Sequence, residues 1–146
     1  MNGYLVDTNI PSELTRKKPE PAVEAFLKQA GKDHVYMSVL SLGEIVKGIA
    51  VLPASRRRQD LEAWLEAEIR PWFAQRILPI SAAIAERWGF LSAGGRLRGA
   101  PVAVVDGLSA ATALENDLTL ATRNSRDFAD LGVAIINPWD RQVTIP

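Results

Sequence analysis

Cysteine is absent from the sequence and histidine occurs once, as His34. Without cysteine the chain can form neither disulfide bonds nor thiolate metal sites, which is typical of proteins in a reducing cytoplasm. Zinc sites and serine or cysteine hydrolases usually need imidazole groups, so a single histidine argues against both classes. Any hydrolytic chemistry in this chain would therefore have to depend on carboxylates.

The sequence also lacks a net charge and a long apolar run. Lysine and arginine together number 17, as do aspartate and glutamate, so no global positive field indicates a nucleic-acid partner and any basic surface must be local. No segment approaches the roughly 20 apolar residues of a membrane span, and no basic run precedes an apolar stretch at the N-terminus. We therefore expect a cytoplasmic protein without membrane contact, folded as one domain over residues 1–146.

Short apolar runs alternate with stretches of helical periodicity along the chain. The runs predict strands over residues 4–6, 35–37, 77–80, 118–122 and 133–136. The helical stretches cover residues 22–30, 39–52, 54–74, 82–93 and 107–114, and residues 94–101 form a glycine-rich connection. Pro71 is expected to bend or restart the third of these helices. The alternation favours βαβ units, so we predict an α/β fold with a mostly parallel central sheet flanked by helices, in three layers.

Acidic residues stand where strands end and helices begin, which is where α/β proteins place their ligand chemistry. Asp7 follows the first strand, Asp106 opens a run of small helix-forming residues, and Asp127 follows the strand at 118–122 after a polar loop. Glu44 lies early in the helix at 39–52, beside its apolar face. A parallel sheet would bring these segments to one edge, so we expect the four carboxylates to lie together.

Simpler roles remain open for some of these residues. Asp7 or Asn9 can cap the helix that follows the first strand. Glu44 can be a solvated surface residue, paired with Lys47 three positions along the helix. The large apolar side chains of the helix at 54–74 can belong to the core or to a subunit interface.

Four carboxylates at close range repel one another unless a cation lies among them. A set of oxygen ligands favours a hard divalent cation, Mg²⁺ or in its place Mn²⁺. Such an ion can activate a water molecule for in-line attack on a phosphodiester. Hydrogen bonds that orient the carboxylates are expected from Thr8, Asn9, Thr122 and Asn124. Contacts with phosphate are expected from arginines that flank the acids, unless these are ordinary surface residues: Arg96, Arg98, Arg123 and Arg126.

Three other classes of protein with an acid at a strand end fit less well. A phosphatase of the haloacid-dehalogenase type needs a second aspartate two residues after the first, where this chain has Asn9. A response-regulator receiver needs a lysine near the end of a late strand, but Lys47 is the last lysine. A phosphate-binding GxxxxGK[ST] loop is missing. These eliminations favour a nuclease.

The same segments resemble the PIN-domain ribonucleases of the VapC toxin type, in their FitB-like branch. The matching pieces, in chain order, are LVDTN at 5–9, SVLSLGE at 38–44, VDGLSAATA at 105–113, ATRN at 121–124 with Asp127-Phe128, and NPW at 137–139. Each motif alone is weak, but the ordered set covers essentially the whole chain and is specific. The resemblance implies a PIN fold and a Mg²⁺-dependent endoribonuclease that hydrolyses RNA phosphodiester bonds. It also implies the toxin of a type II toxin–antitoxin pair: a homodimer that forms a higher assembly with a cognate VapB-type antitoxin, whose C-terminal segment blocks the site.

The resemblance implies that Asp7, Glu44 and Asp106 form the acidic triad. Some relatives carry a fourth acid directly after the Thr-Arg pair, where this chain has Asn124, while others carry it three residues later, at Asp127. We assign the role to Asp127 and keep Asn124 as a hydrogen-bonding neighbour. We predict that Asp7 and Asp106 bind the principal metal directly, and that Glu44 and Asp127 bind it through water or help to deprotonate the attacking water. The alternatives are a catalytically inert PIN-fold module that binds a basic peptide, and a small-molecule phosphohydrolase.

Overall fold

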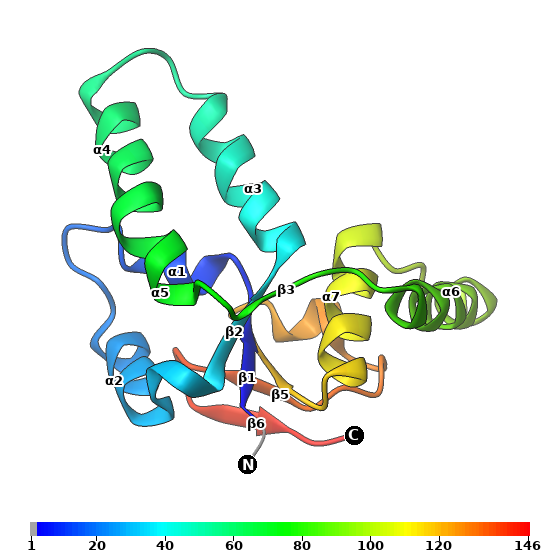
Figure 1. The fold of residues 1–146 in the computed structure, drawn as a ribbon. Helices are drawn as coiled ribbons and strands as arrows, with labels where there is room; N and C mark the ends of the chain where they lie inside the picture. The colour runs from blue at the N-terminus through cyan, green and yellow to red at the C-terminus, as the bar shows by residue number, and fades with distance from the viewer. Residues whose placement is uncertain (1–2) are drawn as a thin grey trace.

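The computed structural model describes residues 3–146 as an α/β fold built on a six-stranded sheet (Figure 1). The strands are β1 (Tyr4–Val6), β2 (Val35–Ser38), β3 (Ile77–Leu78), β4 (Thr119–Ala121), β5 (Ile135–Asn137) and β6 (Gln142–Thr144). Their order is β3-β2-β1-β4-β5-β6. The first four pairs of neighbours are parallel and the last, β5 with β6, is antiparallel. The predicted mostly parallel sheet is confirmed.

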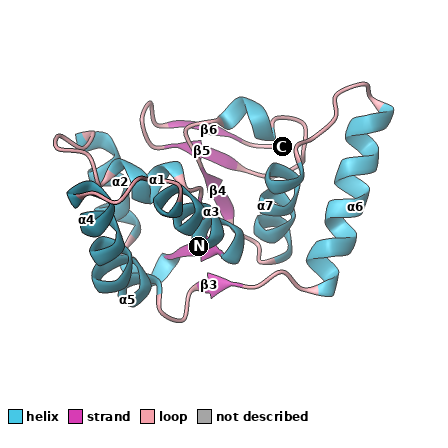
Figure 2. Cartoon of the chain, turned by 90° about the horizontal axis from the view of Figure 1, so that it is seen from above, coloured by secondary structure: helices cyan, strands magenta, loops and turns pink. Residues whose placement is uncertain are grey.

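Helices cover both faces of this sheet, as Figure 2 shows. On one side lie α1 (Asn9–Glu13), α2 (Pro21–Ala30), α3 (Val39–Ala50), α4 (Arg56–Trp64) and α5 (Arg70–Phe73), and on the other α6 (Ala82–Leu97) and α7 (Val104–Glu115). The alternation of side chains along a strand supplies both cores. Val6 packs with Ile10 and Ile69 in one cluster, whereas Leu5 packs with Ala110 in the other. Among residues 3–146, no helix combines the length and apolar character needed to cross a lipid bilayer.

The predicted helix at 54–74 forms, with a change of geometry before Pro71. A π-helical segment, Leu65–Ile69, joins α4 to α5. Proline has no N–H and its ring clashes with the carbonyl four residues back, and a wider π turn accommodates both effects. Leu65, Ile69 and Phe73 are buried, so this part of the apolar stripe belongs to the core. Together with α3, this helix extends away from the sheet as an arm (Figure 1).

The prediction that residues 94–101 form a glycine-rich connection is wrong in its first half, because α6 continues to Leu97. A Cβ atom on Gly95 would lie 2.8 Å from the carbonyl oxygen of Ala100 and 2.9 Å from Cγ2 of Val102. Glycine is needed there because the returning chain packs directly on the helix backbone. The glycine at this position therefore allows close packing and does not end the helix.

Two glycines of the α6–α7 pair differ in their surroundings and predict opposite effects of Gly→Ala. A Cβ on Gly107 would lie 2.8 Å from Cδ1 of Trp88, whereas a Cβ on Gly89 would have no neighbour within 4 Å. We expect Gly107→Ala to destabilise the protein by about 1–3 kcal/mol through overpacking. Gly89→Ala should stabilise it by about 0.5–1 kcal/mol through helix propensity. Urea denaturation measures both, and a change of the same sign in the two variants would contradict this packing.

Glu13 is a buried carboxylate that fixes the chain after α1. The residue is 5 % exposed. It accepts a hydrogen bond of 3.0 Å from the amide of Glu20 and forms an ion pair of 3.3 Å with Arg16. The hydrogen bond from the Glu20 amide is the largest cause of a lowered pKa at Glu13, and the charge of Arg16 lowers it further. The carboxylate therefore holds the segment between α1 and α2.

This lowered pKa predicts a pH dependence of stability. A group whose pKa falls on folding contributes stability above its ordinary value, here 4.5, and loses it as the pH falls through the lowered value. We therefore expect Glu13→Gln to be less stable than the wild type at pH 7, and the difference to vanish in acid. Denaturation at several pH values measures this, with the exposed Glu86→Gln as control. Parallel stability curves for the wild type and Glu13→Gln would rule it out.

Candidate active site

The centre of the sheet places Asp7 beside Thr122. Asp7 directly follows β1, and its amide donates a hydrogen bond of 2.9 Å to the carbonyl of Ala121, which extends the parallel β1–β4 ladder. Thr122 directly follows β4, and its amide donates to the carbonyl of Ile136 at 3.0 Å. Both side chains therefore leave the sheet at the carboxyl ends of its central strands.

The Asp7 carboxylate is held by three donors. The amide of Thr8 donates to Oδ1 at 2.8 Å, while the hydroxyl of Thr122 and the side-chain amide of Asn9 donate to Oδ2 at 2.8 Å and 3.4 Å. The Thr122 side chain is fully buried. The N-cap residue of α1 is Thr8, so the prediction that Asp7 or Asn9 caps this helix is wrong. These bonds fix the direction of the carboxylate.

Glu44 reaches the same site from α3. Ser38 caps this helix, because its hydroxyl accepts a hydrogen bond of 3.1 Å from the amide of Leu40. Glu44 is exposed, and its Oε1 accepts a hydrogen bond of 3.2 Å from the Thr8 hydroxyl. Over residues 3–146 no ion pair joins Glu44 to Lys47, so this glutamate is directed to the site instead.

Asp106 lies in the first turn of α7 and is partly buried. Its pKa is raised, first because burial disfavours the charged form, and then because of the negative charges of Asp127, Asp7 and Glu44. The structure thus brings the four predicted carboxylates into one electrostatic neighbourhood. Like charges at this range repel one another unless a cation lies among them.

The carboxylates fit a hydrated cation better than an enclosed one. Within the described part of the chain, no three acidic or histidine side chains form a closed group of metal ligands. Mg²⁺ is usually bound through one or two carboxylates and keeps several water molecules. Asp7, Glu44, Asp106 and Asp127 supply the oxygen donors that such an ion prefers.

The other predicted polar residues divide into two groups. Thr8, Asn9 and Thr122 use their side chains at the site, and Asn9 also accepts a hydrogen bond of 3.3 Å from the amide of Arg123. Asn124 contributes through its backbone, whose amide donates to the Thr122 hydroxyl at 3.0 Å. Its side chain is exposed.

The four predicted arginines do not lie together. Arg98 and Arg126 line a pocket that also contains Asp106 and Asp127. The guanidinium of Arg123 stacks 5.0 Å from the ring centre of Trp139, outside this pocket, and Arg96 is exposed on α6. Sequence reasoning missed another lining residue, Asp130, which precedes Leu131-Gly132 and has a φ of 66°. An aspartate shortly before a glycine was a signal for this turn.

This fold and site define a three-layer α/β protein with an acidic centre at the carboxyl ends of its parallel strands. The chain belongs to the PIN domain family, whose model matches residues 4–134. The resemblance noted from the sequence is thereby confirmed.

Individual relatives cover nearly the whole chain. Toxin FitB of Neisseria gonorrhoeae is 36% identical over 135 residues, which are 92% of this chain and 97% of the relative. VapC ribonuclease Y4jK of Sinorhizobium fredii is 34% identical over 136 residues, 93% of this chain and 97% of the relative. The crystal structure of FitAcB from Neisseria gonorrhoeae superposes with a TM-score of 0.87 at 36% identity, covering 93% of this chain and 98% of that one.

Proposed function

We propose that this protein is a Mg²⁺-dependent endoribonuclease that hydrolyses RNA phosphodiester bonds as the toxin of a type II toxin–antitoxin pair. The observation that carries the proposal is the convergence of acidic side chains from separate segments: Thr8 and Thr122 hold the Asp7 carboxylate, and the Thr8 hydroxyl also bonds Glu44 of α3. Relatives named Toxin FitB and VapC ribonuclease support it. Mn²⁺ is the expected substitute ion.

Asp7 and Asp106 are the residues that would hold the ion. When bound, the ion polarises a phosphate oxygen and makes a bound water more acidic. The hydrogen bonds from Thr8 and Thr122 keep the Asp7 oxygens in a fixed direction before substrate arrives. This prior ordering lowers the cost of arranging the charges at the moment of reaction.

Glu44 is suited to accept the proton of the attacking water because it is exposed and hydrogen-bonded to Thr8. Asp127 would bind the ion through a water molecule. The water oxygen forms a new bond to phosphorus, and the bond from phosphorus to the 3′ oxygen breaks. The 3′ oxygen takes a proton from solvent, so the products carry a 3′-hydroxyl and a 5′-phosphate.

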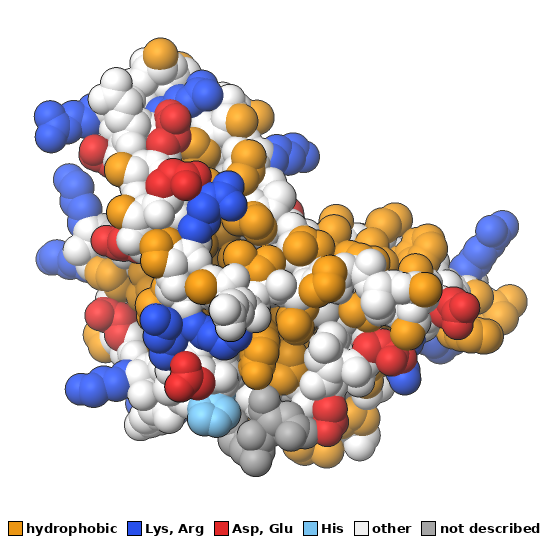
Figure 3. Space-filling model, viewed as in Figure 1, with side chains coloured by type: hydrophobic (Ala, Val, Ile, Leu, Met, Phe, Trp, Pro, Cys, Tyr) orange, Lys and Arg blue, Asp and Glu red, His pale blue; other side chains and the backbone are white. Residues whose placement is uncertain are grey.

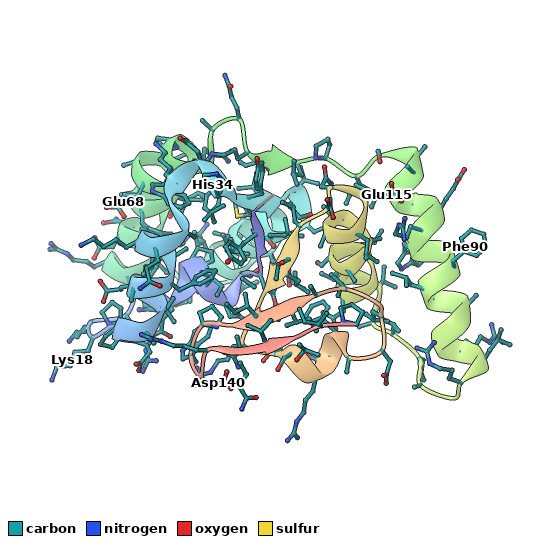
Figure 4. All side chains as sticks on the ribbon, turned by 90° about the horizontal axis from the view of Figure 1, so that it is seen from below. Lys18, His34, Glu68, Phe90, Glu115 and Asp140 are labelled. Atoms are coloured by element: carbon teal, nitrogen blue, oxygen red, sulfur yellow. The ribbon has the colours of Figure 1, made fainter. Side chains whose placement is uncertain are left out.

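The proposal includes two protein partners in the cytoplasm, a second copy of this chain and a cognate VapB-type antitoxin. Apolar surfaces of the chain support the two partners. A cavity of about 120 Å³ between α1 and the arm is lined by Ile10, Trp64 and Trp72. Figure 3 shows apolar side chains on the hollow face between the arm and α6. Phe90 and Leu97 of α6 are 81% and 87% exposed, and Phe90 projects away from the sheet in Figure 4. Exposed apolar surface of this extent is typical of interaction sites.

The proposal is tested with purified, antitoxin-free protein. We expect cleavage of RNA in the presence of Mg²⁺ or Mn²⁺, loss of cleavage in EDTA, and calorimetric uptake of the ion. Absence of cleavage with either ion would overturn the proposal. Faster turnover of a nucleotide monoester would indicate a phosphohydrolase, and tight binding of a basic peptide without metal uptake would indicate an inert binding module.

A further inference from the structure

A pocket of about 370 Å³ adjoins the acidic site on the side of Asp127. One wall is the connection between α6 and α7, with Arg98 and Ala103, and the other is the segment after β4, with Arg126 and Asp130. Asp106 and Asp127 belong to the pocket and to the acidic site alike. The volume is at the low end of the roughly 300–1,000 Å³ usual for ligand sites, which suits one nucleotide.

The two arginines of this pocket are unpaired although three aspartates line it with them. Over residues 3–146, the ion pairs of arginine involve Arg16, Arg58, Arg70 and Arg87 only. Guanidinium groups bind phosphate through a planar pair of N–H donors. Two such groups on opposite walls are therefore available to an anion that enters between them.

The backbone adds positive potential at the same place. The N-cap residue of α7 is Ala103, which lines the pocket and has no side chain that could cap the helix. The amides of the first turn carry the positive end of the helix dipole, which attracts phosphate. Glu44 reaches the acidic site from α3 and does not line the pocket, and Arg123 is stacked on Trp139 outside it. Arg98, Arg126 and the first turn of α7 therefore supply the positive potential of this pocket.

We propose that this pocket binds the RNA nucleotide next to the cleaved phosphodiester, with its phosphate between Arg98 and Arg126. The inference rests on the proposed ribonuclease function and adds residues that position the RNA strand. Asp130 opposes the phosphate, because its charge faces the same pocket without belonging to the four acids of the site. It weakens the hold on the nucleotide and so favours release of product.

The test measures binding of a fluorescein-labelled RNA oligonucleotide of random sequence by anisotropy, at several salt concentrations with Mg²⁺ present. All variants carry Glu44→Gln, which lies outside the pocket, to prevent cleavage. We expect Arg98→Gln and Arg126→Gln each to weaken binding about ten-fold. Each should also reduce the slope of log K against log salt by roughly 0.7, the value for one phosphate contact on a single strand.

Matched controls are available on the same two segments. Arg96→Gln and Arg123→Gln should change affinity less than about two-fold and leave the salt slope unaltered. Asp130→Asn should tighten binding about three-fold, since asparagine tolerates the backbone φ of 66° and only the charge is lost. Thermal melting verifies that each variant is folded.

Equal losses in the pocket arginines and the control arginines would overturn the pocket proposal, because they would indicate unspecific attraction. If the wild type cleaves RNA and the four arginine variants behave alike, the ribonuclease proposal is supported and the pocket proposal is refuted. If the wild type cleaves no RNA but only Arg98 and Arg126 affect binding, the pocket is an RNA-binding site and the ribonuclease proposal is refuted.

Discussion

Replacing Asp106 by asparagine is expected to remove RNA cleavage while making the metal-free protein more stable. The loss of rate should be roughly 10²–10⁴-fold, as for other groups that act on the charges of a reaction. The pKa of Asp106 is raised by burial and by the charges of Asp127, Asp7 and Glu44. A carboxyl group with a raised pKa is most favourable to folding when protonated, and its contribution declines as the pH rises from the ordinary value of 3.8 through the raised one.

The neutral amide removes this repulsion with little change of shape. At pH 7 we expect a rise of about 2 °C in the melting temperature in EDTA, and the rise should disappear below pH 3.8. Addition of Mg²⁺ should stabilise the wild type and leave Asp106→Asn unaffected. Asp33→Asn, at the opposite, amino-terminal edge of β2, is the control and should retain both activity and the response to Mg²⁺. Retention of cleavage by Asp106→Asn would refute the assignment.

Replacing Thr122 by valine is expected to damage stability and metal binding together. The buried hydroxyl donates to Asp7 at 2.8 Å and accepts from the Asn124 amide at 3.0 Å. Valine has nearly the same shape, but it removes the shortest hydrogen bond that the Asp7 carboxylate receives from a side chain. We expect a loss of about 1–3 kcal/mol in the free energy of unfolding. The affinity for Mg²⁺ should fall roughly 10–100-fold, as when other groups that orient metal ligands are removed.

The same strand supplies a control for this effect. Thr119→Val changes an identical side chain at the start of β4, three residues from the site, and should leave the affinity for Mg²⁺ unchanged. Thr122→Ser restores the hydroxyl and should recover most of the affinity at some cost in packing. Calorimetric titration with Mg²⁺ and urea denaturation measure the two quantities. Normal Mg²⁺ affinity in a folded Thr122→Val protein would show that the hydroxyl does not position Asp7.

The hydrophobic pattern was enough to predict the parallel sheet and the placement of the acids. Asp7 and Asp106 were recognisable because Asp7 follows a strand and Asp106 lies in the first turn of a helix, and the sheet topology then brings those ends together. The strand β6 was missed because it has only three residues, all exposed, and so provides no apolar run of the kind that marks the other strands. The end of α6 was missed because Gly94 and Gly95 look like a break, whereas Gly95 is in fact a packing position.

The separate surroundings of the four arginines could not be predicted from the chain. Arg123 and Arg126 are three residues apart, yet one stacks on Trp139 and the other lines the pocket. Arg96 and Arg98 are two residues apart and also differ. Such differences depend on contacts between segments distant in sequence, which local patterns do not contain.

The position of β1 has a consequence for the way the protein is controlled. This strand has β2 on one side and β4 on the other, so both of its edges are occupied and its residues Leu5 and Val6 are buried. Amide protons of such a strand exchange with solvent only when the whole molecule opens, whereas those of the exposed arm and of α6 exchange through smaller openings. Asp7 therefore keeps its place for as long as the protein stays folded. An inhibitor that acts on Asp7 would therefore have to cover its carboxylate, because partial opening of the arm or of α6 leaves β1 in place.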